Sequence, residues 1–519
     1  MGVFSLVLHT HLPYVRRNGV WPSGEDFFHQ AATESYLPLL ETLERLAENG
    51  PTGALLTVGV TPLIGHQMQD PHLLRELQIY LGSWDLRAWW QVANYEGVYR
   101  DEFKDLAGFY ARHARKQLAR LDALPGGMAA GFGALEDAGT IEIIGGPASH
   151  PVLPEIMEPS VLRAQIFHGI SEHERLFGRR PRGVWLPECA YHPDAGIEGV
   201  LADAGVTHFV VDGPTMIRSD GPDATFAPRL VNDSGVAAFG RNLDVTYRVW
   251  SPTGGYPTNK WYREYFAYDM VAGFKNWRVT SIRTPIAGKK PYEPTRAIER
   301  AHRDAEEFVG LLDGWLAAHE ERTGAEGVVV ACYDTELFGH WWFEGPAFLE
   351  RVYRLLDRHP RIRAMSLERA LQQVPPRKAV SLVEGSWGFR KDLRSWIAPE
   401  TQEMWRMLAE TEAETVRIAG KFARGGDVDA GVGEGRVSAL AQLARELFLL
   451  QSSDWPFMVL RGRNDGYARE RFHAHRARWQ RLSDALLRRT PDDVLERLAH
   501  ELFEIDNPFP TLRADELLP

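Results

Sequence analysis

Apolar residues gather in short runs over about the first 370 residues, and each run ends at polar or acidic positions. The runs show no strict alternation, which is typical of strands buried on both faces of a parallel sheet. Stretches with helical spacing separate them, at 34–48, 159–178 and 294–321. This alternation predicts an α/β barrel or an open doubly wound sheet. The strand-like runs are 3–11, 54–62, 140–150, 183–188, 207–213 and 327–336.

Two insertions interrupt this alternation, and a different pattern follows it. Residues 67–130 read as helical, whereas residues 214–290 read as irregular and are rich in Gly, Pro, Tyr and Trp. Loops on one face of an α/β barrel usually build the binding surface. A Pro-containing boundary near residues 372–380 precedes an all-helical region. We therefore expect a catalytic domain over 1–375, including both insertions, and a helical domain over 376–519 that completes the substrate cleft.

Composition narrows the class of protein. Hydrophobic residues make up 44% and charged residues 25% of the 519 positions, as in ordinary globular proteins. No apolar run approaches the roughly 20 residues that span a bilayer, and the N-terminal segment lacks the regions of a signal peptide. The net charge of −11 without a Lys/Arg-rich tract argues against nucleic acid as a partner. We expect a cytoplasmic protein with no membrane partner, in which both cysteines, Cys189 and Cys332, are reduced.

Chemically capable side chains follow the ends of several predicted strands. In a parallel barrel, the carboxyl ends of the strands converge on one face, where catalytic groups gather. A single polar residue at a strand end carries little information, but several such residues in one barrel mouth form the pattern of a site. The candidates are His9, His11, His150, Glu188, Asp212, Asp334 and Glu336, with His340 and Trp341 close behind the last strand.

Two carboxylates in an aromatic-rich chain indicate glycoside chemistry. One acid, from the pair Glu188 and Asp334, would protonate the leaving oxygen, and the other would attack the anomeric carbon or activate water. Histidine, aspartate and arginine side chains would hydrogen-bond the sugar hydroxyls. The chain has 16 tryptophans, whose flat rings can stack on sugar faces. The candidates for stacking are Trp21, Trp250, Trp261, Trp341 and Trp387.

A metal site is the rival interpretation. His9 and His11 are separated by one residue on an extended strand, so both side chains point to the same side. With Asp212 or Asp334 they could hold zinc and activate water, as in a metal-dependent hydrolase or deacetylase. No other sequence feature requires a metal or a cofactor, and we expect neither.

Five short motifs occur in order along nearly the whole chain, and together they resemble glycoside hydrolase family 57. Two further stretches, VWSPTGGYP (249–257) and WYREYF (261–266), resemble the 1,4-α-glucan branching members of that family. The five motifs are LHTHLPYV (8–15), GGPASHPVLP (145–154), GVWLPECAY (183–191), YDTELFGHWWFEGP (333–346) and SSDWPFM (452–458).

The resemblance implies a (β/α)7 barrel with a helical insertion and a C-terminal all-helical domain. It also implies a retaining mechanism without a metal, in which Glu188 is the nucleophile and Asp334 the general acid/base. The covalent intermediate would be resolved by an acceptor sugar or by water. The resemblance places His9, His11 and His150 around the reacting sugar, and Arg241, Trp387 and Asp454 at substrate-binding positions.

Two departures from the branching pattern leave a second activity open. The stretch after the nucleophile strand is short, and its candidate loop, residues 223–240, lacks the tyrosine that closes over the site in branching members. Arg463, expected at the substrate, stands where those members have a glutamine. Our first hypothesis is a monomeric enzyme that forms α-1,6 branches in an α-1,4-glucan. The second is an α-1,4-glucan hydrolase on the same scaffold, because a shorter lid excludes water less well.

Overall fold

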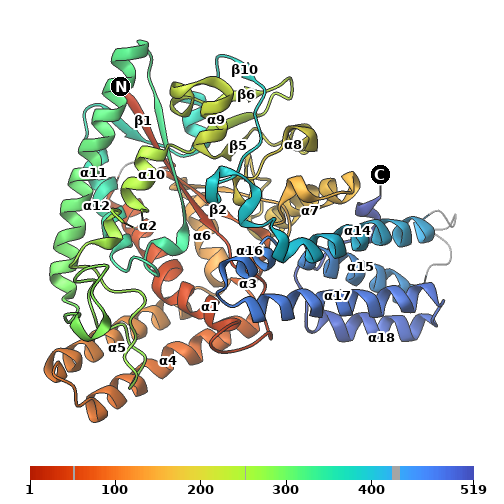
Figure 1. Cartoon of the computed structure of the whole chain (residues 1–519), viewed down its shortest axis with the longest axis horizontal. Helices are drawn as coiled ribbons and strands as arrows, with labels where there is room; N and C mark the ends of the chain where they lie inside the picture. The colour runs from red at the N-terminus through yellow and green to blue at the C-terminus, as the bar shows by residue number, and fades with distance from the viewer. Residues whose placement is uncertain (51–52, 252, 424–432, 519) are drawn as a thin grey trace.

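The computed structural model describes residues 1–50, 53–251, 253–423 and 433–518. Strands in the upper part of the molecule are flanked by helices, and a bundle of long helices extends to the right (Figure 1). The strands are β1 (Gly2–Thr10), β2 (Leu56–Val60), β3 (Ile141–Ile144), β4 (Gly183–Trp185), β5 (His208–Val211), β6 (Arg229–Val231), β7 (Ala237–Gly240), β8 (Val328–Asp334), β9 (Ile362–Ala364) and β10 (Ala379–Val380).

The helices between these strands lie mostly around the strands. They are α1 (Glu25–Ala31), α2 (Leu37–Asn49), α3 (Pro62–Gln67), α4 (Pro71–Asn94), α5 (Arg100–Asp122), α6 (Gly127–Asp137), α7 (Pro159–Phe177), α8 (Ile197–Asp203), α9 (Gly213–Asp220), α10 (Leu243–Val249), α11 (Pro294–Thr323), α12 (Gly345–Asp357) and α13 (Leu367–Gln373). A π-helical turn, η1 (Ala32–Tyr36), connects α1 to α2.

The strands form two sheets that meet at both ends. One sheet has the order β3-β2-β1-β8, with β9 also paired to β1, and the other has the order β10-β6-β7-β5-β4. A parallel bridge from Gly145 to Val184 joins β3 to β4. The backbone N–H of Asn242, just after β7, donates to the carbonyl of Val330 in β8 at 2.8 Å. Seven parallel strands, β1, β2, β3, β4, β5, β7 and β8, therefore follow one another around a ring, as a (β/α)7 barrel requires.

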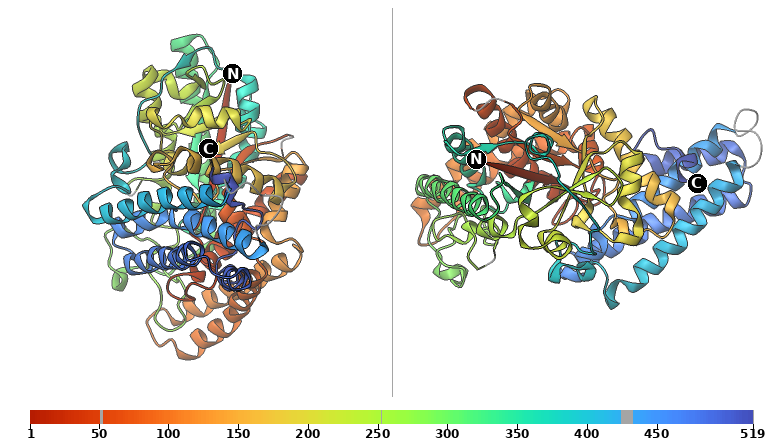
Figure 2. Two further views of the ribbon diagram at one scale, coloured as in Figure 1. Left: turned by 90° about the vertical axis from the view of Figure 1, so that its right-hand side faces the viewer. Right: turned by 90° about the horizontal axis from the view of Figure 1, so that it is seen from above.

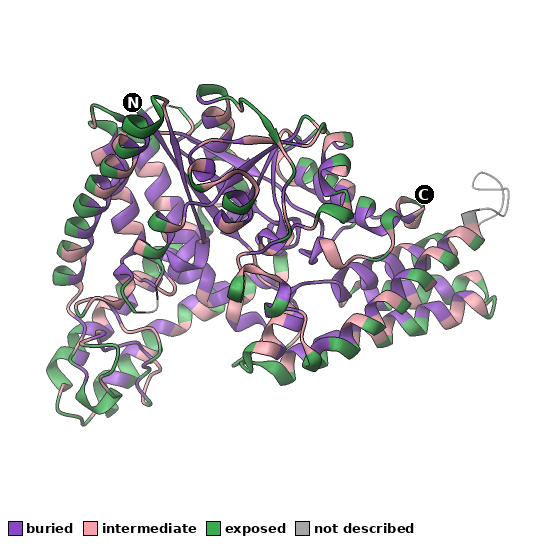
Figure 3. Ribbon diagram, turned by 45° about the horizontal axis from the view of Figure 1, so that its top comes forward, coloured by how far each residue is buried: buried purple, intermediate pink, exposed green. Residues whose placement is uncertain are grey.

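All six predicted strand runs are strands in the structure. The irregular segment predicted over 214–290 is wrong in its first part, because β6, β7 and α10 lie there and β7 completes the ring. Every residue of β1 is buried, which explains why its sequence shows no alternation. Figure 3 shows the same contrast, with buried strands inside and exposed faces on the outer helices. Cys189 and Cys332 are free and buried.

The helical insertion consists mainly of α4 and α5, which pack side by side at the lower left of Figure 1. Asp70 caps α4, accepting hydrogen bonds from the backbone N–H groups of His72 and Leu73, each at 3.0 Å. The later loop insertion lies along this pair, because Arg87 on α4 donates to the carbonyls of Ala272 and Gly273.

From α14 (Gln402–Ala423) on, the C-terminal region is helical and extends from one side of the ring (Figure 2). The segment before it, which the prediction included in the helical domain, contains β10 and belongs to the barrel sheet through the pairing of β10 with β6. The hydrophobic core of the helical region also includes residues of α7, which anchors the bundle to the barrel. No helix in the described ranges carries an apolar stretch long enough to cross a bilayer. The helices of the C-terminal region are α14 (Gln402–Ala423), α15 (Glu434–Leu450), α16 (Asp454–Arg461), α17 (Asp465–Leu487) and α18 (Asp492–Phe503).

Candidate active site

The strand ends of the barrel meet the turn that precedes α16. Ser452 and Ser453, at this turn, contact the segment after β3: Ser452 bridges to Pro151, and the Ser453 N–H donates to the carbonyl of His150 at 3.0 Å. The helical domain thereby places two of its own residues, Ser453 and Asp454, among the side chains that come from β1, β3 and β4.

Glu188 lies at the centre of this contact. It follows β4 in a short 3-10 turn with a positive φ of 62°, a conformation that non-glycine residues adopt rarely and mostly at functional sites. One carboxylate oxygen accepts a hydrogen bond from the indole N–H of Trp387 at 2.7 Å, and the other accepts from the hydroxyl of Ser453 at 2.8 Å. The carboxyl group is fixed in direction by donors from two different parts of the chain.

Histidines continue the hydrogen-bond chain away from Glu188. His150 Nδ1 is 2.9 Å from the Ser453 hydroxyl, and His150 Nε2 is 3.0 Å from His9 Nε2. Because Ser453 gives its only proton to Glu188, His150 must donate from Nδ1, and His9 must then donate from Nε2 to His150. Burial lowers the pKa of both histidines well below the usual value, so both are neutral at physiological pH.

His11 is held by the helical domain. Its Nε2 is 2.9 Å from a carboxylate oxygen of Asp454, and its Nδ1 is 3.0 Å from the hydroxyl of Thr61. The His11 ring stacks on that of His150, with centroids 3.8 Å apart. The sequence-predicted residues His9, His11, His150, Glu188, Trp387 and Asp454 therefore form one cluster, which we call the Glu188 cluster.

Asp334 ends β8 directly opposite His9 of β1. Burial raises its pKa to about 6, while the charges of Arg241 and His11 work in the other direction. Burial also raises the pKa of Glu188 to about 7, against the two hydrogen bonds that favour its ionised form. The Asp334 charge contributes to that rise, so the two carboxyl groups lie within electrostatic reach of each other.

Arg241 lies beside Trp387 and is held by Asp212. The Arg241 guanidinium lies 5.4 Å from the Trp387 ring and donates to Asp212 at 2.7 Å. Asp212 is completely buried and also pairs with Lys391 at 3.1 Å. Its carboxylate thus faces two cations rather than a sugar, and it orients Arg241.

A second group of predicted residues lies at the aromatic rim. Trp250 stacks on Trp341 with centroids 5.6 Å apart. His340 is hydrogen-bonded on both ring nitrogens, to Glu34 at 2.7 Å and to the Tyr265 hydroxyl at 3.1 Å. These contacts place the residues after Asp334 against the loop insertion.

Three further predicted residues lie outside both groups. Arg463 is exposed, and its guanidinium lies 5.1 Å from the ring of Phe266. Trp21 is 77% exposed. Trp261 packs among Arg278, Arg296 and Lys260, and none of these belongs to the Glu188 cluster.

Sequence reasoning missed Ser453 as a functional residue. The SSDW motif contains it next to Asp454, but nothing in the sequence shows that its hydroxyl reaches Glu188, 265 positions away. Glu336, noted as a strand-end acid, is buried and accepts a hydrogen bond from the Tyr36 hydroxyl. Burial and the Asp334 charge raise the pKa of Glu336 to about 8.

The His-x-His pair does not fit a metal site in this arrangement. Both ring nitrogens of His11 are engaged by Thr61 and Asp454, and His9 Nε2 is directed to His150. Within the described parts of the chain, one group could hold a metal ion by spacing: Glu446, His475 and Asp506, in the helical domain. There Arg471 donates to His475 Nε2 at 2.7 Å, and Arg478 pairs with Asp506. Arginine side chains therefore already take the positions from which His475 and Asp506 would bind a metal ion.

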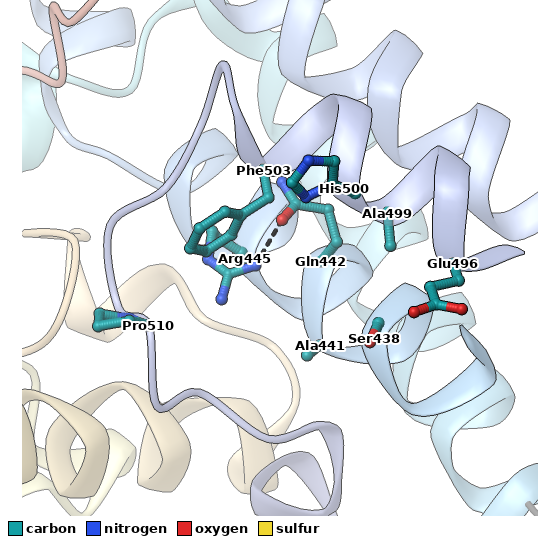
Figure 4. A pocket seen from close by; sticks show the side chains of 9 residues that line it. All are labelled: Ser438, Ala441, Gln442, Arg445, Glu496, Ala499, His500, Phe503 and Pro510. Atoms are coloured by element: carbon teal, nitrogen blue, oxygen red, sulfur yellow. Dashed lines mark hydrogen bonds between the residues drawn. The ribbon is translucent and has the colours of Figure 1, made fainter. Parts of the chain in front are cut away.

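A cavity of about 310 Å³ lies on the helical domain, between α15 and α18 (Figure 4). Arg445, Gln442, His500 and Phe503 line it, and Arg445 donates to Gln442 across its wall. It contains no residue of the Glu188 cluster, so the candidate active site is the strand-end face of the barrel.

Comparison with known proteins agrees with this geometry. A family model described as "Glycosyl hydrolase family 57" matches residues 5–383, and one described as "1,4-alpha-glucan branching enzyme, C-terminal" matches residues 408–515. A probable 1,4-alpha-glucan branching enzyme of Mycobacterium tuberculosis is 36% identical, covering 99% of this chain and 98% of its own.

Two solved structures are similar over almost the whole chain. The GH57-type branching enzyme of Pyrococcus horikoshii superimposes with a TM-score of 0.91 at 34% identity, covering 100% of this chain and 97% of its own. The alpha-amylase AmyC of Thermotoga maritima superimposes with a TM-score of 0.87 at 27% identity, covering 99% of each chain. Both activities expected from the sequence are therefore represented among similar folds.

Proposed function

The chain belongs to glycosyl hydrolase family 57, and from this membership and the geometry of the Glu188 cluster we propose that it is a retaining 1,4-α-glucan branching enzyme. The observation that carries the chemistry is the environment of Glu188, a buried carboxylate that accepts hydrogen bonds from Trp387 and Ser453. The branching assignment is supported by similarity to branching enzymes over nearly the full length and by the C-terminal domain match.

In the first step, we propose, Glu188 attacks the anomeric carbon of an α-1,4-linked glucose. The bond from C1 to the leaving O4 breaks as Asp334 transfers its proton to O4, which leaves a covalent glycosyl-Glu188 intermediate. In the second step, Asp334 takes the proton of an acceptor 6-hydroxyl, and that oxygen displaces Glu188 from C1. The product is an α-1,6 branch, and both carboxyl groups return to their starting states.

The first step requires an ionised Glu188 and a protonated Asp334. In the empty site the order of the two pKa values is the reverse, about 7 for Glu188 and about 6 for Asp334. The values differ by about one, so the productive arrangement costs only about 1.4 kcal/mol. Near neutral pH the pair shares one proton, and the reaction starts from the fraction of molecules in which that proton lies on Asp334.

The hydrolase remains the second candidate because of a specific structural observation. The segment predicted to hold a lid, residues 223–240, contains the strand pair β6–β7, and β7 pairs with β5 in the barrel wall. No tyrosine lies in this segment. The overlap with the Thermotoga maritima amylase fold agrees with this alternative.

The partner we propose is an α-1,4-glucan such as amylose or a glycogen-like polymer, bound by a monomer. We also infer a cytoplasmic location, which the two free, buried cysteines support. Burial raises the pKa of both thiols, so neither is expected to act as a nucleophile.

Proton NMR of amylose incubated with the protein tests the proposal, because it counts new α-1,6 linkages against new reducing ends. Branch signals should dominate, and the Glu188→Gln variant should lose at least about a thousandfold of either activity. A dominance of reducing ends would favour the hydrolase instead. Retention of activity by Glu188→Gln would remove the catalytic assignment, and a loss of activity after EDTA treatment would favour the metal hypothesis.

A further inference from the structure

The helical insertion forms one wall of a second cavity, of about 650 Å³, which contains no residue of the Glu188 cluster. Asp26, Gln30 and Glu34 form another wall; they are spaced four residues apart and so share one helical face. The loop at 268–275 closes the third side. We call this space the insertion cavity. Its volume lies within the range typical of small-molecule sites.

Aromatic rings cover much of the insertion cavity. Tyr80 and Trp84, which lie four residues apart on α4, face into it, and Trp21 and Tyr268 stand at its rim. The rim rings are open to solvent, with exposed fractions of 77% for Trp21 and 41% for Tyr268. A lining with buried rings inside and exposed rings at the rim suits ligands that have both apolar faces and polar edges.

The charges in the wall balance one another. The lining contains three acidic side chains and three basic ones. Glu34 pairs with Arg263 at 2.8 Å and with Lys275 at 3.1 Å, and Gln30 donates to Asp26 at 2.7 Å. A phosphate or another ion would have to compete with these partners, whereas a neutral polyhydroxyl ligand can share their remaining hydrogen-bonding capacity.

The π-helical turn η1 connects the insertion cavity to the active-site face. Glu34 faces the cavity and accepts from His340 on the other side. The next residue, Ser35, donates to the carbonyl of Thr335 at 2.8 Å, directly after Asp334. Tyr36 donates to Glu336. A ligand in the cavity therefore lies one helical turn away from the segment that carries the general acid/base.

We propose that the insertion cavity binds a segment of the α-glucan substrate outside the Glu188 cluster, as a second site that holds the polymer next to the cleft. This proposal rests on the proposed function, because the ligand class is the substrate of that reaction. A polymer held at two sites has a high effective concentration at the second once the first is filled.

Equilibrium dialysis with maltotriose, in the Glu188→Gln background to prevent turnover, tests the site. Adding Ser83→Trp, which fills the cavity from α4, should remove one bound maltotriose per chain. Gly82→Trp is the matched control, since a side chain there points into open space and Gly82 does not line the cavity. The control should bind as much maltotriose as Glu188→Gln alone.

Equal stoichiometry in Ser83→Trp and Gly82→Trp, with both chains folded by circular dichroism, would overturn the proposal. If Ser83→Trp fails to fold, Tyr268→Ala replaces it, because this side chain lies at the rim of the cavity. Its maltotriose affinity at the cavity should fall by about fivefold to tenfold, the loss expected for one aromatic contact. Unchanged affinity would equally contradict the site.

The branching assay on the protein with an unaltered Glu188 separates this proposal from the proposed function. If Ser83→Trp loses one bound maltotriose and the protein with an unaltered Glu188 forms no branches, the cavity is a glucan site and the branching assignment is wrong. If that protein forms branches and Ser83→Trp binds as much maltotriose as the control, the branching assignment stands and the cavity is not a glucan site.

Discussion

The Glu188 side chain shows how a single residue is prepared for its proposed role. Burial favours the neutral acid, and the hydrogen bonds from Trp387 and Ser453 favour the anion. The backbone is constrained as well, since Glu188 and His150 both have a φ of 62°. Such strained positions persist only where the surroundings fix them. Here Ser453 fixes both, because its hydroxyl contacts the side chains of Glu188 and His150.

Removing the Ser453 hydroxyl should therefore change the pH dependence of the reaction. Glu188 must be ionised to attack, and its hydrogen bond from Ser453 lowers its pKa. In Ser453→Ala the pKa of Glu188 rises by about one unit, the equivalent of one hydrogen bond to a charged group. Because Glu188 has the higher of the two pKa values, it sets the basic limb of the kcat/KM profile. That limb should move up by about one pH unit and the plateau should fall about tenfold, while the acidic limb, set by Asp334, stays in place.

Measurement of kcat/KM against pH with a soluble maltooligosaccharide as substrate checks this expectation. In the unaltered protein, activity should fall below pH about 6, where both carboxyls are protonated, and above about 7, where both are ionised. Ser438→Ala, an exposed position on α15, serves as the control. A basic limb that stays in place in Ser453→Ala would show that the hydroxyl does not act on the ionisation of Glu188.

At the scale of elements, the sequence predicts long or strongly apolar segments well and short ones poorly. The runs of β1 and β8 are apolar because both faces are buried, and they are predicted correctly. β7 has only four residues, Ala237–Gly240, and three of them are Ala or Gly, so its place in the barrel depends on pairing with β5 and not on its own pattern. Asp212 is a similar case, because only tertiary structure places Arg241 and Lys391 around it.

Asp70 connects the insertion to the rest of the molecule and should be sensitive to substitution. One carboxylate oxygen caps α4, and the other accepts from Arg16 at 3.0 Å in a buried ion pair. Asp70→Ala removes the cap, for about 1 kcal/mol, and leaves a buried charge unpaired, for about 3–5 kcal/mol in total. Asp70→Asn keeps the cap and should be intermediate.

The midpoint of thermal unfolding of the whole chain ranks these variants, with limited proteolysis showing whether α4 opens first. Asp101→Ala, in the exposed first turn of α5, is the control and should remain close to the unaltered protein. Equal midpoints for Asp70→Ala and Asp70→Asn would mean that the cap contributes little. If both variants also unfold at the midpoint of the unaltered protein, the ion pair between Arg16 and Asp70 contributes little to stability as well.

At the scale of the whole molecule, the candidate site belongs to both domains. The barrel supplies Glu188, Asp334 and the histidines, and the start of α16 supplies Ser453 and Asp454. Sequence motifs predicted every one of these residues except Ser453, because strand ends and motif order are local signals. The hydrogen-bond directions could not be predicted, since they depend on how the helical domain docks on the barrel.

The contact between the two domains includes a buried acid, Glu412 on α14. Glu412 accepts from the backbone N–H of Met157 at 2.9 Å and from Gln451 at 2.7 Å, and Gln451 accepts from Gln165 of α7 at 2.8 Å. Burial raises the pKa of Glu412 to about 7, although these donors lower it. The folded chain therefore binds a proton here, between pH about 4.5 and about 7, that the unfolded chain does not.

The contribution of Glu412 to stability should consequently fall as pH rises from about 4.5 to about 7 and then level off, because the raised pKa favours the folded state only while Glu412 is protonated. Glu412→Gln is neutral at every pH and lacks this contribution, so the thermal midpoint of the unaltered protein minus that of Glu412→Gln should fall over this range. Glu188, Asp334 and Glu336 contribute to the slope in both proteins, and buried histidines such as His9 and His150 contribute with the opposite sign. The difference between the two slopes therefore isolates Glu412. Glu403→Gln, exposed on the same helix, should keep the full slope. Parallel curves for Glu412→Gln and the unaltered protein would show that the interface between the domains does not titrate at this residue.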